Sequence, residues 1–146
     1  MATMSPTAPA APRRTSTVRR NALLLTAGAL VIAAATTVVA LIAQALGAGD
    51  FPALKPAVYM SFAIAGFLAG YVGWRIVRAR AARPTRALRL LVPLLLVVSL
   101  VPDVVLLVTG FIPGTTVAGV IALMLMHPIV VAVGVPLFQR IAPVAS

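Results

Sequence analysis

The sequence predicts an all-α protein, a transmembrane four-helix bundle with both termini in the cytoplasm, and three observations lead to this prediction. Hydrophobic residues make up 62% of the chain and charged residues only 10%, whereas about 25% of the residues of soluble domains are charged. Apolar runs long enough to cross a bilayer occur four times, separated by short polar connections. Basic residues gather in alternate connections, which is the pattern that orients membrane spans.

The composition also excludes several classes of function. A formal net charge of +10 would indicate nucleic-acid binding in a soluble protein. Here the arginines lie beside apolar runs, so we interpret them as topology signals and expect no nucleic-acid partner. The chain has no cysteine, which removes disulfides, thiolate metal sites and dithiol redox chemistry. Abundant Arg, Ala, Val, Leu and Pro, with one Lys and one Asn, are typical of a bacterium with GC-rich codons.

Residues 1–20 hold three prolines among Ser, Thr and Ala and then four arginines. Such a segment cannot bury a core, so we predict a disordered basic tail. The apolar run at 22–46 is longer than the about 7–15 residues of a signal-peptide core, and we interpret it as a retained first span. One face of this span carries a small, mildly polar stripe that should face the bundle. The stripe consists of Ala33, Thr37, Ala40 and Gln44.

The connection 47–56 is predicted to be an ordinary loop because it is rich in glycine and proline. Span two follows at 57–77, with Tyr59 and Trp74 near its two ends, as is typical of interfacial aromatic residues. One face of span two carries a GxxxG pattern that favours close helix packing, and its members are Gly66, Gly70 and Gly73. We expect this face to pack within the monomer, with self-association as the alternative.

A short basic connection joins spans two and three. Its six arginines are Arg75, Arg78, Arg80, Arg83, Arg86 and Arg89. Span three is predicted at 90–108 and span four at 117–138, so that residues 21–140 form one transmembrane domain followed by a C-terminal tail at 141–146. The main interpretation of the arginines is a topology signal, and the second is contact with anionic lipid headgroups.

The distribution of basic residues orients the chain. Eleven of the twelve lie in the N-terminal tail, in the arginine-rich connection or near the C-terminus, and the other two connections hold only Lys55. Positive residues stay cytoplasmic. We therefore predict a multi-pass protein of the cell inner (plasma) membrane with the N-terminus and the C-terminus inside.

Two residues stand out as candidates for function. Asp103 is the only acidic residue in any long apolar run, and His127 is the only histidine. An ionisable residue within a span is costly and is a functional candidate by default. A central Asp disfavours insertion by about 2.5–3.5 kcal/mol, while each Leu or Val contributes about −0.3 to −0.6 kcal/mol. The eight Leu and seven Val of span three outweigh one Asp, so insertion does not require Asp103 to be paired.

Counting helical rise places both residues in the outer half of the bundle, Asp103 roughly 8 Å and His127 roughly 15 Å below the outer ends of their spans. Pro102 and Pro128 lie beside them and remove backbone hydrogen bonds. A small water-accessible pocket would satisfy the freed carbonyls. We expect the polar cluster of this outer pocket to comprise Asp103, His127, Gln44, Ser61 and Ser99.

We prefer to interpret Asp103 and His127 as hydrogen-bonding residues between helices, with a proton relay as the alternative. Bonds of this kind average about 0.6 kcal/mol. One His and one Asp are too few for a protein-only metal site, which usually has three or four ligands. No nucleophile motif supports a hydrolase. The residues thus indicate no metal, no cofactor and no catalytic side chain.

The residues around this pair form a wider pattern. It consists of Ser99-Leu-Val-Pro-Asp103-Val, of His127 in the last span, and of Val135-Pro136-Leu137 before Arg140. In this pattern, and in the arginine-rich segments, residues 13–140 resemble a bacterial family of small four-span membrane proteins catalogued as a domain of unknown function. Pro128 departs from the apolar residue usual after the histidine. The resemblance implies a four-helix integral membrane protein and supplies no activity.

The function that these observations favour is that of a non-enzymatic structural or accessory component of the bacterial inner membrane. Its expected partners are membrane lipid, including anionic headgroups at the cytoplasmic face, and other membrane proteins or a second copy. The alternative is a small proton-coupled transporter or carrier that uses Asp103 and His127. A membrane enzyme acting on a lipid or isoprenoid substrate is the least supported hypothesis.

Overall fold

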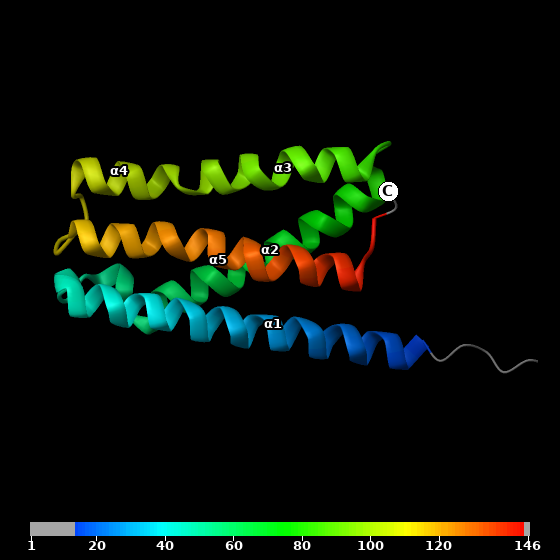
Figure 1. The fold of residues 1–146 in the computed structure, drawn as a ribbon, viewed down its shortest axis with the longest axis horizontal. Helices are drawn as coiled ribbons and strands as arrows, with labels where there is room; N and C mark the ends of the chain where they lie inside the picture. The colour runs from blue at the N-terminus through cyan, green and yellow to red at the C-terminus, as the bar shows by residue number, and fades with distance from the viewer. Residues whose placement is uncertain (1–13, 145–146) are drawn as a thin grey trace, which may run out of the picture.

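In the computed structural model, which describes residues 14–144, every regular element is a helix (Figure 1). The elements in order are α1 (Arg14–Ala43), the π-helical turn η1 (Gln44–Ala48), the short 3-10 helix η2 (Pro52–Leu54), α2 (Pro56–Arg80), α3 (Pro84–Ser99), α4 (Val101–Thr109) and α5 (Val117–Ile141). Four stretches are long and apolar enough to cross a membrane: Thr17–Ala48, Pro56–Arg80, Pro84–Thr109 and Val117–Ile141. The predicted all-α class with four long helices is confirmed, and these helices indicate a membrane protein.

The helix α5 is the central element of the bundle, because it contacts α1, α2, α3 and α4. In Figure 1, α1, α5 and the α3–α4 stretch run side by side, while α2 crosses behind α5 from α1 toward the beginning of α3. The start of α1, the α2–α3 connection and the end of α5 share one end of the bundle, here called the basic end. The opposite end, which holds the connections 49–55 and 110–116, is called the loop end.

Proline and threonine set several helix starts. Pro56 and Pro84 occupy the first positions of α2 and α3, where the missing N–H costs nothing and the fixed φ suits a helix. Thr116 caps α5, its Oγ1 accepting a hydrogen bond from the Gly119 N–H at 3.1 Å. The predicted boundary of α1 needs correction: residues 14–20, assigned to the disordered tail, are helical. They contain no Gly or Pro, and arginine favours helices. Residues 1–13 lie outside the described range.

The connection at the loop end between α1 and α2 is not an ordinary loop. Phe51 and Leu54 are each 1% exposed and pack in the core of this end of the bundle with Tyr59, Leu106 and Val120. Gly47, with φ of 91°, ends the π-helical turn before them, a backbone angle that glycine adopts without strain. The folded connection therefore closes the loop end of the bundle.

A second core lies toward the basic end and is mostly aromatic. Phe138 on α5 contacts three rings of α2, with ring centroids 5.2 Å from Phe67, 5.6 Å from Tyr71 and 6.1 Å from Trp74. Trp74 donates from Nε1 to the carbonyl oxygen of Ala142 at 3.0 Å. Trp74 and Tyr59 do lie near the ends of α2, but both are buried within the protein, at 5% and 4% exposure.

Close packing of the GxxxG face within the monomer, which was the preferred prediction, does not occur at Gly66 or Gly73, and self-association through this face stays a prediction. A Cβ built on Gly66 or Gly73 would meet nothing within 4 Å, and one on Gly70 would make an ordinary contact with Phe138 at 3.4 Å. The face points out of the bundle because the buried face of α2 carries Phe67 and Trp74.

Other glycines provide the close helix contacts. A Cβ on Gly28 would lie 2.5 Å from Leu137 and 3.0 Å from Phe67, and one on Gly134 would lie 3.1 Å from Phe138 of its own helix and 3.5 Å from Phe67 of α2. At these positions the large aromatic rings of the second core fill the space that a side chain would need.

Candidate functional site

The candidate site begins with a break in the third long helix. The α-helix stops at Ser99 and resumes at Val101, with Leu100 between α3 and α4. Pro102 explains the break, since it has no N–H and its ring clashes with the preceding turn. Asp103 therefore lies in the first turn of α4, where the free N–H groups and the helix dipole favour a negative charge.

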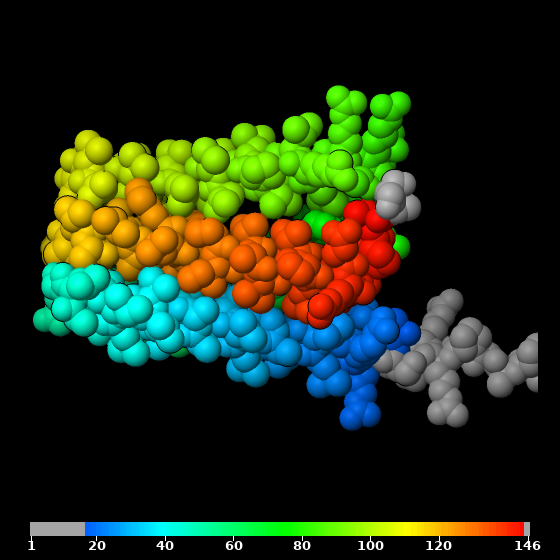
Figure 2. Space-filling model, viewed as in Figure 1, coloured from blue at the N-terminus to red at the C-terminus, as the bar shows by residue number. Residues whose placement is uncertain are grey.

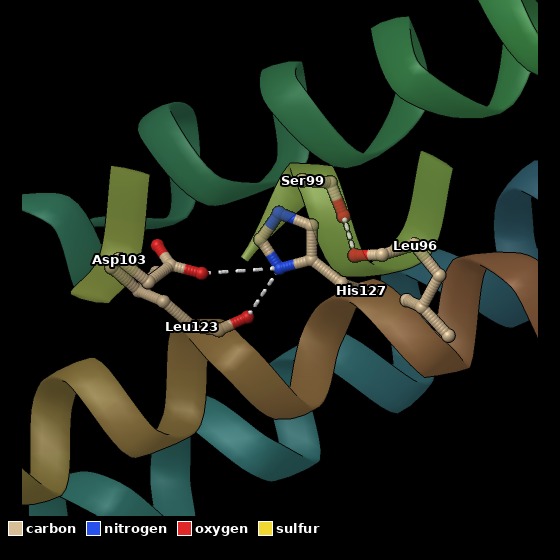
Figure 3. Close-up of polar contacts among 5 residues, drawn as sticks. All are labelled: Leu96, Ser99, Asp103, Leu123 and His127. Atoms are coloured by element: carbon tan, nitrogen blue, oxygen red, sulfur yellow. Dashed lines mark hydrogen bonds and ion pairs between the residues drawn. The ribbon is translucent and has the colours of Figure 1, made fainter. Parts of the chain in front are cut away.

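Asp103 points inward, toward α5. Its residue exposure is 7%, and its Oδ2 lies 3.4 Å from Nδ1 of His127 (Figure 3). The sequence predicted that these two ionisable residues belong to one cluster, and the fold brings them into contact across two helices. His127 is less enclosed, because 32% of its side chain is exposed.

The second contact of His127 identifies the protonated ring nitrogen. Nδ1 lies 2.9 Å from the carbonyl oxygen of Leu123, one turn back on α5. A carbonyl oxygen only accepts hydrogen bonds, so we assign the proton to Nδ1, donating to Leu123. Asp103 Oδ2 is close enough for an electrostatic contact but is buried with no hydrogen-bond partner among the described residues. The pair is thus incompletely satisfied.

Ser99 lies one turn from Asp103 but belongs to a separate local contact. Its Oγ donates to the carbonyl oxygen of Leu96 at 2.7 Å (Figure 3). The hydroxyl therefore satisfies a carbonyl of its own helix next to the break, and the structure gives it no hydrogen bond to Asp103.

Gln44 and Ser61, which were predicted to join the cluster, lie on the outside of the bundle. Ser61 is two residues beyond the buried Tyr59, which on a helix is a rotation of about 200°, and its Oγ donates to its own helix at Val58, 2.8 Å away. Gln44 opens the π-helical turn, which shifts it from the line of Ala40. The prediction used the depth of each residue along its span, and it did not account for the direction in which each side chain faces.

A buried polar residue that sequence reasoning missed lies on α1, next to Thr37 of the predicted stripe. Thr36 is fully buried and donates from Oγ1 to the Ile32 carbonyl oxygen at 2.8 Å. The neighbouring Thr37 hydroxyl lies 3.0 Å from the hydroxyl of Tyr59, which joins α1 to α2. The buried face of α1 shares Ala40 with the predicted stripe and otherwise lies one residue earlier, at Ile32, Thr36 and Ala43. The predicted stripe and the observed buried face are both apolar enough to be buried, so the sequence does not separate them. A buried threonine is tolerated because its hydroxyl bonds to a carbonyl of its own helix.

The site has limited chemistry of its own. Within the side chains described, no group of three or more His, Asp or Glu residues could hold a metal ion. The Asp103–His127 pair offers one carboxylate, one imidazole N–H bound to Leu123, and an open Nε2. It can hold or pass a proton, accept a hydrogen bond from a ligand, or attach α4 to α5.

Comparison with known proteins gives a family and no function. Residues 13–143 match the family of unknown function DUF6069, so the chain belongs to this family. No curated protein and no solved structure matches the chain.

Proposed function

We propose, for this member of a family of unknown function, a non-enzymatic role as a structural or accessory component of the bacterial inner membrane. The observation that carries the proposal is the Asp103–His127 contact, in which the two ionisable residues of the spans meet each other. Residues that attach one helix to another need no substrate to account for their presence. The exposed apolar surface of the bundle would face lipid or other membrane proteins.

The orientation we propose has both termini in the cytoplasm. Arginines occur in the first turns of α1, the last turns of α2, the first turns of α3 and the last turn of α5, all at the basic end. The loop end holds Asp50 and Lys55. This asymmetry supports a cytoplasmic basic end, because positive residues are retained on that side. A reporter fused after Arg140 should be active only in the cytoplasm, and activity only outside would overturn the orientation.

The accessory role is tested by isolating partners from native membranes. The full chain, tagged at the C-terminus and cross-linked before solubilisation, should repeatedly capture the same membrane protein. A control variant is Leu125→Lys, which places a charge on the exposed surface of α5. Leu125 is 51% exposed, so this substitution leaves the core intact. Recovery of the tagged chain alone, from cells that express it at natural levels, contradicts the accessory role.

A second candidate, a small proton-coupled carrier, is favoured by one specific observation. Asp103 Oδ2 lacks a hydrogen bond and lies beside the break between α3 and α4, and it faces His127 on the unbroken α5. Transporters use broken helices at their binding sites. In proteoliposomes, a carrier predicts a proton flux that Asp103→Asn abolishes while the fold stays intact. Loss of stability with no flux in either protein contradicts the carrier.

A further inference from the structure

The end of α2 carries a hollow lined by both charged and apolar side chains. Its volume is about 500 Å³, and it is lined by Arg75, Ile76, Arg78, Ala79 and Arg80. All three guanidinium groups are exposed. The hollow lies at the basic end of the bundle, far from the Asp103–His127 pair.

One of these arginines is held in place before any ligand arrives. Nη1 of Arg75 donates to the Tyr71 hydroxyl at 3.1 Å, and its Cζ lies 5.9 Å from the centre of the Tyr71 ring. A guanidinium has five N–H donors, so most remain free for a ligand. A fixed side chain loses less conformational entropy on binding than a mobile one. Arg75 is therefore suited to bind a phosphate group.

Among the described residues, no carboxylate side chain lies at the basic end to neutralise the positive charge of the hollow. The chain has two acidic residues; Asp50 lies at the loop end and Asp103 within α4. An anion is the complementary ligand for such a cluster.

The surface next to the hollow is apolar and unoccupied by other helices. Ile76 is 49% exposed and Val72, one turn further from the basic end, is 54% exposed. Gly73 lies between them, and a Cβ there would meet nothing within 4 Å. Together they form a shallow apolar track that runs from the arginines toward the middle of the helix.

We propose that this end of α2 binds one anionic phospholipid, with the phosphate at Arg75, Arg78 and Arg80 and an acyl chain along Val72, Gly73 and Ile76. The charge selects an anion, and the adjoining apolar track selects a lipid over a free phosphate ion. The site rests on the membrane placement proposed above and is independent of any role of Asp103 and His127.

Native mass spectrometry of the purified full chain in detergent tests the site. Phosphatidylglycerol should be retained as one molecule per chain, while phosphatidylcholine is released. The triple variant R75Q/R78Q/R80Q should bind phosphatidylglycerol roughly a hundredfold more weakly, at about fivefold per arginine. The matched control R83Q/R86Q/R89Q removes the same charge from the neighbouring segment and should weaken binding by less than about fivefold. Equal losses in the two variants would mean diffuse attraction and overturn the site.

A second variant separates the lipid from other occupants. Gly73→Leu keeps every arginine and, because its side chain meets no neighbour, should keep the fold, yet it should obstruct the acyl chain and weaken phosphatidylglycerol binding. Displacement of the lipid by millimolar inorganic phosphate, or full binding by Gly73→Leu, overturns the lipid assignment. A wild-type dimer that Gly73→Leu converts to monomer assigns the track to a second copy instead. A chain that enters nanodiscs but fails to retain phosphatidylglycerol contradicts this site alone and leaves the membrane placement standing.

Discussion

The third membrane-crossing helix and the other three are attached to the bundle in different ways. Over their most apolar segments, Thr17–Ala48, Pro56–Arg80 and Val117–Ile141 each have 22% of their residues buried, whereas Pro84–Thr109 has 11%. The buried residues of this third stretch are Leu88, Asp103 and Leu106. A carboxylate is thus one of its few buried contacts. Figure 2 shows the α3–α4 stretch (green to yellow) lying along one side of α5 as an outer layer.

This difference explains why a polar contact suits α4. In lipid, apolar side chains gain little by leaving the acyl chains, so helices associate through close packing and polar contacts. Helices α1, α2 and α5 achieve close packing with glycines and aromatic rings. The third stretch has few such contacts, and Asp103 with His127 supplies an electrostatic one.

The largest effect is expected from removing an aromatic ring from the second core. Phe67→Ala should destabilise the protein by about 3 kcal/mol, the low end of the range for a buried Phe. We expect the low end because unfolding in a membrane returns the side chain to lipid and not to water. Phe67 is 1% exposed and contacts Phe138. Unfolding with increasing SDS in mixed micelles measures the change. Phe62→Ala on the same helix, 75% exposed, is the control and should have almost no effect; similar losses in both would contradict the assigned faces of α2.

Overpacking the glycine contact should have the next largest effect. Gly28→Leu would place a side chain against Leu137 and Phe67 and should cost about 1–3 kcal/mol. Gly66→Leu, with open space around its Cβ, should be neutral or slightly stabilising because glycine disfavours helices. The thermal midpoint of the purified protein distinguishes the two. A lower midpoint for Gly66→Leu than for Gly28→Leu would reverse our assignment of the close contact.

Removing the polar contact between α4 and α5 should have the smallest measurable effect on stability. His127→Ala should destabilise by about 0.6 kcal/mol and by no more than about 1.7 kcal/mol, the range for polar contacts between membrane helices. Asp103→Asn keeps the size of the side chain and should be tolerated, and Ser61→Ala, which removes only a local bond, should change nothing. Double-mutant analysis of Asp103→Asn with His127→Ala measures the coupling directly; additive effects would show that the 3.4 Å contact contributes nothing.

The sequence was informative where the signal is local. Four apolar runs predicted four long helices, and prolines predicted the break beside Asp103. Depth along the spans placed Asp103 and His127 in one polar cluster, but the contact between them is seen only in the structure. Each of these inferences needed only the order of residues along the chain.

The buried face of each helix was harder to predict, because a helix surrounded by lipid lacks the usual contrast between a polar exposed face and an apolar buried face. The exposed face of α2 carries Gly66 and Gly73, and its buried face carries Phe67 and Trp74, which is the reverse of the expectation from small-residue packing. Gln44 and Ser61 were misplaced for the same reason. The folded connection with Phe51 and Leu54 was missed because glycine and proline around it are equally typical of an exposed loop.

That connection determines how anything could reach the polar pair. Phe51 and Leu54 fill the loop end together with Ala48 and Val120, all at most 1% exposed, and Leu106 lies one turn beyond Asp103 in the same apolar cluster. Among the described residues, apolar side chains therefore fill the interior of the bundle at this end. His127 keeps 32% of its side chain exposed, so in the membrane placement proposed above a molecule would approach it from the side of the bundle, through the hydrocarbon of the bilayer.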